Sequence, residues 1–191
     1  MKDNPLAALL AAVRALNRPT RLTLLRIALV PVYLVLLWLP AYAELALAVF
    51  AAASLTDLFD GRIARERGLV TNFGKFMDPI ADKLLTHTAF IMLTAMGRLN
   101  VVACIIFIAR EFVVSGLRLV AVEQGRVIAA GMSGKVKTVL QMALVMALTA
   151  RLDMHGLALP VRLLTLAAAA MTLYSMAEYV WQNRAVLGDV K

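Results

Sequence analysis

The sequence predicts an all-α protein that is embedded in a membrane. Of its 191 residues, 62% are hydrophobic and 17% are charged, against roughly 45–50% and about 25% in soluble domains. A soluble globule of this size has no interior large enough to bury so much apolar side chain. The mean hydropathy of +0.80 points the same way.

Six apolar stretches, each near the roughly 20 residues that a helix needs to cross a bilayer, account for this composition. The predicted spans are Leu22–Leu39, Ala43–Phe59, Phe76–Met96, Val101–Ala121, Val136–Ala150 and Leu157–Tyr179. Turn or charge signals separate them at Pro40, Arg62–Thr71, Gly97–Asn100, Gln124–Gly134 and Arg151–Gly156. We therefore expect one membrane-embedded domain over residues 1–191, with no separate soluble domain.

The first 20 residues are expected to form a helix that lies along the membrane surface. Asn4 followed by Pro5 is typical of a helix N-cap and first turn. Arg14 directly follows the short apolar run, where a signal peptide would have small uncharged residues and a cleavage site. With Arg18 and Arg21 it suits a juxtamembrane amphipathic segment at a cytosolic interface.

The basic residues predict the orientation. The formal net charge is +8, and in the six-span arrangement every Lys and Arg except Arg98, Arg151 and Arg162 falls on one side. Because positive loops stay in the cytosol, both termini are expected there. No basic run is interleaved with aromatic residues in a polar segment, which argues against nucleic-acid binding.

Acidic residues cluster at the cytosolic ends of the second and third predicted spans. The cluster consists of Asp57, Asp60, Asp78 and Asp82. Spacings of three, four and seven share one face of a helix, so Gly61 and Ala64 join the first pair and Gly74 the second. Antiparallel packing of the two helix ends would bring the four carboxylates together.

The cost of these carboxylates indicates a cation between them. One Asp in hydrocarbon costs about 2.5–3.5 kcal/mol on insertion scales, so four unpaired ones would cost roughly 10–14 kcal/mol. Carboxylate oxygens without His or Cys partners favour Mg²⁺ or Mn²⁺, and four acids fit two such ions. A two-metal site can hold the attacking and leaving oxygens of a phosphoryl transfer.

Small residues on the same face add to this interpretation. Gly61 and Ala64 leave space for a nucleotide or diphosphate against the helix, and Arg65 can bind phosphate with both arms of its guanidinium. The alternative is a structural charge network of the acids with nearby arginines and lysines. That network would neutralise the acids, but it would not explain the small residues.

The pattern D-x2-D-G-x2-A-R-x8-G-x3-D-x3-D, from Asp57 to Asp82, resembles the signature of the CDP-alcohol phosphotransferase family at every fixed position. The resemblance extends to its bacterial phosphatidylglycerophosphate synthases. Segments similar to theirs are Asn17–Arg26, Asp78–Lys83, Arg110-Glu111 and Gly134–Thr138. The resemblance covers essentially the whole chain.

The resemblance implies a reaction, CDP-diacylglycerol plus sn-glycerol 3-phosphate giving phosphatidylglycerol phosphate and CMP. It implies that Asp57, Asp60, Asp78 and Asp82 hold two Mg²⁺ or Mn²⁺ ions and that Asp82 is also the base. It further implies a homodimer in the bacterial inner membrane with a cytosolic active site. The residues expected to bind the CDP-lipid are Asn17, Thr23, Gly61, Ala64, Arg65, Thr71 and Gly74.

An anionic acceptor needs a second group of cations. Arg110, Arg118, Lys135 and Lys137 lie at the cytosolic ends of the fourth and fifth predicted spans. Lys135 and Lys137 would diverge on a regular helix, so either Gly134 delays the helix start or only one lysine reaches substrate. We favour Arg110, Arg118 and Lys135, with Lys137 weaker. Glu111 either orients Arg110 or forms a plain ion pair with it.

Two further interpretations stay open at this point. The same transfer could use another acceptor, such as phosphatidylglycerol, serine or inositol phosphate, because the acidic signature is common to these reactions. A small cation transporter would also carry intramembrane acids. It predicts acids near mid-bilayer, however, whereas these lie at the ends of their spans and beside small residues.

Overall fold

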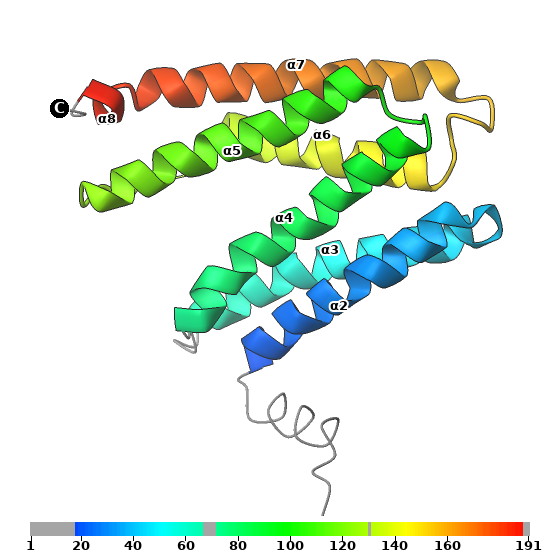
Figure 1. Cartoon of the computed structure of the whole chain (residues 1–191), viewed down its shortest axis with the longest axis horizontal. Helices are drawn as coiled ribbons and strands as arrows, with labels where there is room; N and C mark the ends of the chain where they lie inside the picture. Colours follow the sequence, from blue (N-terminus) through cyan, green and yellow to red (C-terminus); the bar gives the residue numbers. More distant parts are fainter. Residues whose placement is uncertain (1–17, 67–71, 130, 189–191) are drawn as a thin grey trace, which may run out of the picture. The chain divides into compact units, whose positions relative to one another are not determined.

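The apolar stretches form helices, as the sequence predicts. A computed structural model describes residues 18–66, 72–129 and 131–188, and this part of the chain contains no β-strand (Figure 1). Its long helices are α2 (Arg18–Trp38), α3 (Ala43–Glu66), α4 (Asn72–Ala95), α5 (Val101–Glu123), α6 (Met132–Thr149) and α7 (Ala158–Gln182). The 3₁₀ turn η1 (Pro40–Tyr42) and the short α8 (Ala185–Gly188) complete them. The all-α prediction is confirmed.

Most helix ends lie within four residues of the predicted ones, and two differences bear on the site. Helix α3 continues past Phe59 to Glu66, so a break that begins at Arg62 is wrong. The segment after Phe59 is largely polar, but apart from Asp60 and Gly61 it consists mostly of residues that favour helices, namely Arg, Ala and Glu. Helix α6 begins at Met132, so Gly134 lies inside it and does not delay its start. The predicted interfacial helix of the first 20 residues falls almost entirely outside the described residues.

The chain divides into two units, up to Ala89 and from Phe90 on, and α4 contributes to both. In the first unit, α2 packs along α3. Fully buried Tyr33 and Phe50 meet with ring centroids 5.4 Å apart. Arg26 is also buried, and its Nε donates to the carbonyl oxygen of Ala53 at 3.4 Å. These contacts connect the two helices along their length.

In the second unit, α7 packs against both α5 and α6. Successive contacts join Arg110 to Ser175 and Gln124 to Val186, so α5 and α7 run side by side in the same direction (Figure 1). Phe107, Leu144 and Ala168 form part of a fully buried core. The helices leave large apolar side chains on the outside: Val101, Val102, Ile105, Phe112, Leu119, Leu163, Leu166 and Leu173.

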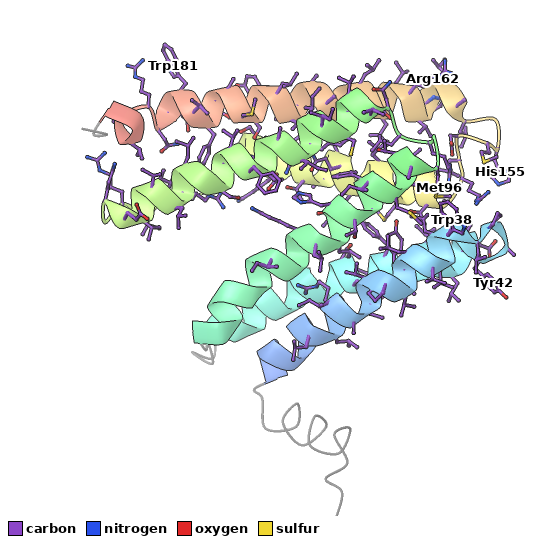
Figure 2. The ribbon with its side chains drawn as sticks, in the orientation of Figure 1. Trp38, Tyr42, Met96, His155, Arg162 and Trp181 are labelled. Carbon is purple, nitrogen blue, oxygen red and sulfur yellow. The ribbon has the colours of Figure 1, made fainter. Side chains whose placement is uncertain are left out.

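Helix α7 alone, within the described residues, is both long and apolar enough to cross a membrane, and shorter apolar helices cover Leu24–Trp38 and Pro40–Leu55. Figure 2 shows Arg162 near the start of α7 and Trp181 at its far end. The exposed apolar faces of the second unit are of the kind that lipid covers.

Glycines follow the ends of α4 and α5. Gly97 and Gly125 have φ of +70° and +71°. Around Gly125, Arg126 N donates to Ala121 O at 2.8 Å and Gly125 N to Val122 O at 2.9 Å. This is the Schellman arrangement, in which a left-handed residue stops the helix and satisfies its last carbonyl groups.

We expect Gly125→Ala to destabilise the protein by about 1 kcal/mol, because alanine resists the left-handed conformation. Gly116→Ala in the same helix is the matched control and should stabilise by about 0.8–1 kcal/mol. An added Cβ meets no heavy atom within 4 Å at either position, so only the backbone conformation differs. The measurement is thermal unfolding in detergent. It is monitored by the reaction of Cys104 with a thiol-reactive fluorophore, because this buried cysteine becomes accessible only on unfolding. Shifts of Tm in the same direction for both variants would contradict this explanation.

Candidate active site

The predicted acidic residues lie on two helices. Asp57 and Asp60 are in α3, and Asp78 and Asp82 are in α4. Helical spacings of three and four place each pair on one face of its helix. The side chains at these positions lie outside the described residues, and so does the predicted meeting of the four carboxylates. Among the side chains that are described, no group of three or more His, Cys, Asp or Glu could hold a metal ion.

The residues predicted to bind the CDP-lipid follow the same helices. Gly61, Ala64 and Arg65 continue α3 beyond Asp60, and Gly74 is in the first turn of α4. Thr23 is in α2. Asn17 and Thr71 fall outside the described residues, and for the other five only the backbone is described.

A buried polar cluster joins the three long helices of the second unit. We call it the Arg110 cluster, and its members are Arg110 and Glu111 on α5, Lys137 on α6 and Ser175 on α7. Glu111 Oε1 accepts from Arg110 Nη1 at 2.8 Å and also pairs with Lys137 Nζ. Arg110 Nη2 donates to Ser175 Oγ at 2.9 Å. The side chains of Arg110 and Lys137 are only 9% and 5% exposed.

The cluster explains the glycine at position 134. A Cβ added there would lie 3.3 Å from Arg110 Nη2 and 3.8 Å from Ser175 Oγ. The first distance is tighter than an ordinary van der Waals contact, so a side chain at this point of α6 would push against the guanidinium. Gly134 therefore gives Arg110 the room to reach Ser175.

The other two predicted cations lie differently. Arg118 is exposed, and its Nε donates to the hydroxyl oxygen of Tyr179 at 3.1 Å. Lys135 is exposed, whereas Lys137 is buried. The two lysines diverge as the helical spacing predicts, but the preference for Lys135 does not match the cluster that the structure brings together.

Sequence reasoning missed Ser175, although a signal was present. Three polar residues, Thr172, Ser175 and Tyr179, recur at helical spacing within the apolar α7. All three are buried, and Thr172 accepts a hydrogen bond from Gln141 of α6 at 3.1 Å. A polar stripe on an otherwise apolar helix marks the face that meets polar partners.

The cluster is suited to bind an anion. Its described members carry two positive charges and one negative charge, in surroundings where the effective dielectric constant is low. Arg110 Nε is buried and finds no hydrogen-bond acceptor among the described residues. A buried donor without a partner costs about 1–3 kcal/mol, and a phosphate oxygen would remove that cost.

Known proteins are similar to this chain over most of its length. A protein of Bacillus subtilis (strain 168) is 44% identical over 146 residues, which cover 69% of this chain and 76% of the relative. One of Salmonella paratyphi A is 38% identical over 183 residues, 91% of this chain and 98% of the relative. One of Rickettsia bellii is 47% identical over 104 residues, 53% of this chain and 58% of the relative. Each is named CDP-diacylglycerol–glycerol-3-phosphate 3-phosphatidyltransferase.

A family profile covers nearly the same region. Residues 16–179 match the profile described as CDP-alcohol phosphatidyltransferase. The matched range includes the acidic positions of α3 and α4 and all four members of the Arg110 cluster. With this coverage, and with relatives of such identity, the chain belongs to the CDP-alcohol phosphatidyltransferase family.

Proposed function

We propose that this protein transfers the phosphatidyl group of CDP-diacylglycerol to sn-glycerol 3-phosphate and releases CMP. The observation that carries the choice of acceptor is the Arg110 cluster, which presents a buried guanidinium N–H without a partner among the described residues. A phosphorylated alcohol uses such a site, whereas serine brings a carboxylate and an amine instead. Glycerol 3-phosphate and inositol phosphate both carry the phosphate, and the names of the relatives favour glycerol 3-phosphate between these two.

The acidic positions fit divalent ions by their donor chemistry. Four carboxylates without His or Cys partners are the ligand type that Mg²⁺ and Mn²⁺ prefer. Asp57, Asp60, Asp78 and Asp82 would hold the ions, and the family generally uses divalent metal. When bound, the ions would supply positive charge opposite the diphosphate and the leaving CMP.

The other residues bind, orient and move a proton. Arg65 would bind the diphosphate, while Gly61 and Ala64 leave room for the nucleotide against α3. Arg110 and Lys137 would hold the phosphate of the acceptor. Asp82 would take the proton from the glycerol hydroxyl as its oxygen bonds to the phosphorus that carries diacylglycerol, and the bond from that phosphorus to the CMP oxygen breaks.

We further propose that six helices, α2 to α7, cross a bacterial inner membrane, with both termini and the active site on the cytosolic side. The exposed apolar faces of α5 and α7 support lipid contact. Most basic residues would then face the cytosol. By resemblance to the family, the protein is expected to form a homodimer.

The acceptor and the metal can be tested together. Purified protein is incubated with CDP-diacylglycerol and, separately, glycerol 3-phosphate, phosphatidylglycerol, serine or inositol phosphate. We expect product only with glycerol 3-phosphate, loss of turnover with chelator, and recovery when Mg²⁺ or Mn²⁺ is added. A product with another acceptor would overturn the assignment of substrate, and turnover that resists chelation would overturn the metal site.

The role of Asp82 predicts a selective loss of kcat. Asp82→Asn should lower kcat by about 10²-fold or more, which is the usual contribution of a general base, while CDP-diacylglycerol still binds. Glu123→Gln, which removes an exposed carboxylate at the end of α5, is the control and should retain turnover. Near-normal turnover of Asp82→Asn would show that another group accepts the proton. We expect Asp82 to be the most weakly ligated of the four acids, since a carboxylate committed to a cation is a poor base.

The Arg110 cluster predicts which KM changes. Arg110→Gln and Lys137→Gln should each raise the KM for glycerol 3-phosphate by about 10- to 100-fold, the value of a hydrogen bond to a charged group. The KM for CDP-diacylglycerol should change far less. Comparison of Lys137→Gln with Lys135→Gln decides which lysine binds the acceptor. Equal effects on both substrates would argue that the cluster only supports the fold.

A further inference from the structure

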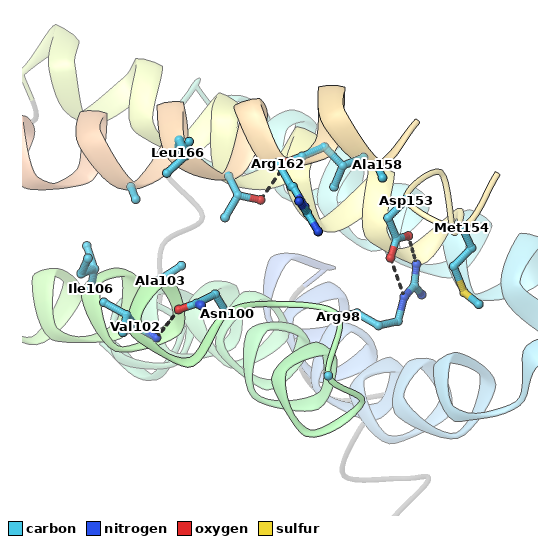
Figure 3. Close-up of a pocket in the computed structure, with 14 residues that line it drawn as sticks. Arg98, Asn100, Val102, Ala103, Ile106, Asp153, Met154, Ala158, Arg162 and Leu166 are labelled. Atoms are coloured by element: carbon cyan, nitrogen blue, oxygen red, sulfur yellow. Dashed lines mark hydrogen bonds and ion pairs between the residues drawn. The ribbon is translucent and has the colours of Figure 1, made fainter. Parts of the chain in front are cut away.

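A cavity of about 880 Å³ lies between the N-terminal parts of α5 and α7 (Figure 3). On both helices, the residues of the Arg110 cluster come later in the sequence than the residues that line this cavity. Its size is within the range of pockets that hold small molecules. Most of its wall is apolar, formed by Val102, Ala103, Ile106, Val161, Leu166 and Ala169. We call it the α5–α7 cavity. None of the residues proposed for the transfer reaction lines it.

Charged residues line the same cavity. Arg98 precedes α5, and its Nε donates to Asp153 Oδ2 at 3.3 Å, with a second contact from Nη2 to Oδ1. This pair is neutral, and the Arg98 side chain is only 8% exposed. Arg98 Nη1 is buried without a hydrogen-bond partner in the described part of the chain. The cavity therefore adjoins a guanidinium with an unsatisfied donor.

Arg162 adds an unbalanced charge. It is exposed on α7, lines the cavity, and extends from α7 toward α5 in Figure 3. It makes no hydrogen bond or ion pair with any described residue. With Arg98 already paired to Asp153, the cavity carries a net positive charge next to its apolar wall. An occupant that matches both features has an anionic group joined to an apolar chain.

The position of Arg162 along α7 favours a lipid over a free anion. Arg162 is the fifth residue of a helix that is long and apolar enough to span a bilayer. At about 1.5 Å per residue, it lies roughly 6 Å from the helix start. In a membrane this is the depth at which lipid phosphates meet the hydrocarbon, and arginines near helix ends extend toward that layer.

We propose that the α5–α7 cavity binds one anionic phospholipid, with its phosphate at Arg162 and Arg98 and part of an acyl chain along the apolar wall. The proposal rests on the membrane embedding proposed above but not on the transfer reaction. In the proposed orientation the site faces the outer leaflet, opposite the cytosolic active site. The bound lipid is therefore structural rather than a substrate.

The test is photo-crosslinking of the full chain in nanodiscs. The discs consist of phosphatidylcholine with a small fraction of phosphatidic acid that carries a diazirine on one acyl chain. Peptide mapping should find the label within residues 102–106 and 161–169. Phosphatidylcholine with the same diazirine should label these segments less, because its headgroup has no net charge.

Two pairs of variants test the two halves of the site. Arg162→Gln should reduce this labelling about fivefold, the effect of one arginine near a lipid surface. Arg184→Gln, which removes an exposed arginine near the other end of α7, should not. Ala169→Leu fills the cavity and should reduce labelling, whereas Ala170→Leu alters the next residue, which does not line the cavity. The Tm of each variant, measured by thermal unfolding with Cys104 labelling, checks that the variant is folded.

Three results would overturn the proposal. Labelling that neither Arg162→Gln nor Ala169→Leu reduces would place the lipid elsewhere. Loss of labelling in millimolar inorganic phosphate would indicate a free-anion site, and crosslinks from these segments to a second copy of the chain would indicate a protein interface. Transferase turnover is assayed on the same samples, so that failure of the reaction and failure of the lipid site are distinguished.

Discussion

The carboxylate of Glu111, held between the cations of Arg110 and Lys137, is the interaction on which the second unit depends. All three side chains are largely buried, with 15%, 9% and 5% exposed. Removal of one partner from a buried ion pair typically costs 3–5 kcal/mol, because the remaining charge stays out of water. A shift of α6 relative to α5 would separate Lys137 from Glu111 and would therefore carry this energetic cost. The hydrogen bond from Arg110 to Ser175 extends the same constraint to α7.

This constraint also organises the faces of α7. Its polar stripe, Thr172, Ser175 and Tyr179, meets polar side chains of α5 and α6, and the opposite faces carry exposed apolar residues such as Leu173 and Tyr174. From Thr172 to Tyr179 the helix is thus reversed with respect to a soluble bundle, polar toward its neighbours and apolar outward, whereas its earlier buried residues, Val161 and Ala168, are apolar. A guanidinium fixed by a carboxylate and a hydroxyl is preorganised, so an arriving phosphate orders few additional groups.

Helix positions could be predicted from apolar runs, but their polar extensions could not. Helix α3 continues beyond Phe59 because helix propensity and hydrophobicity are different properties. After Phe59 the hydrophobicity of the sequence decreases, but most of the residues still favour a helix. Helical spacing shows that Lys135 and Lys137 diverge, but not which one faces inward. That depends on how α6 packs against α7 and pairs with Glu111 of α5, which is tertiary structure and leaves no local signal in the sequence. Ser175 did have a local signal in the stripe of α7. The acidic positions are helical as expected, while the meeting of their carboxylates stays a prediction.

The two proposed binding sites of the second unit share one physical cause. Arg98 Nη1 and Arg110 Nε are both buried donors without acceptors among the described residues. In a helical bundle most backbone carbonyl groups are already used within the helices, so side chains or ligands must satisfy a buried guanidinium. Asp153 and Glu111 each satisfy part of one. Phosphate oxygens are suited to the remaining donors. The apolar wall beside Arg98 favours a lipid, and the second cation beside Arg110 favours a small dianion.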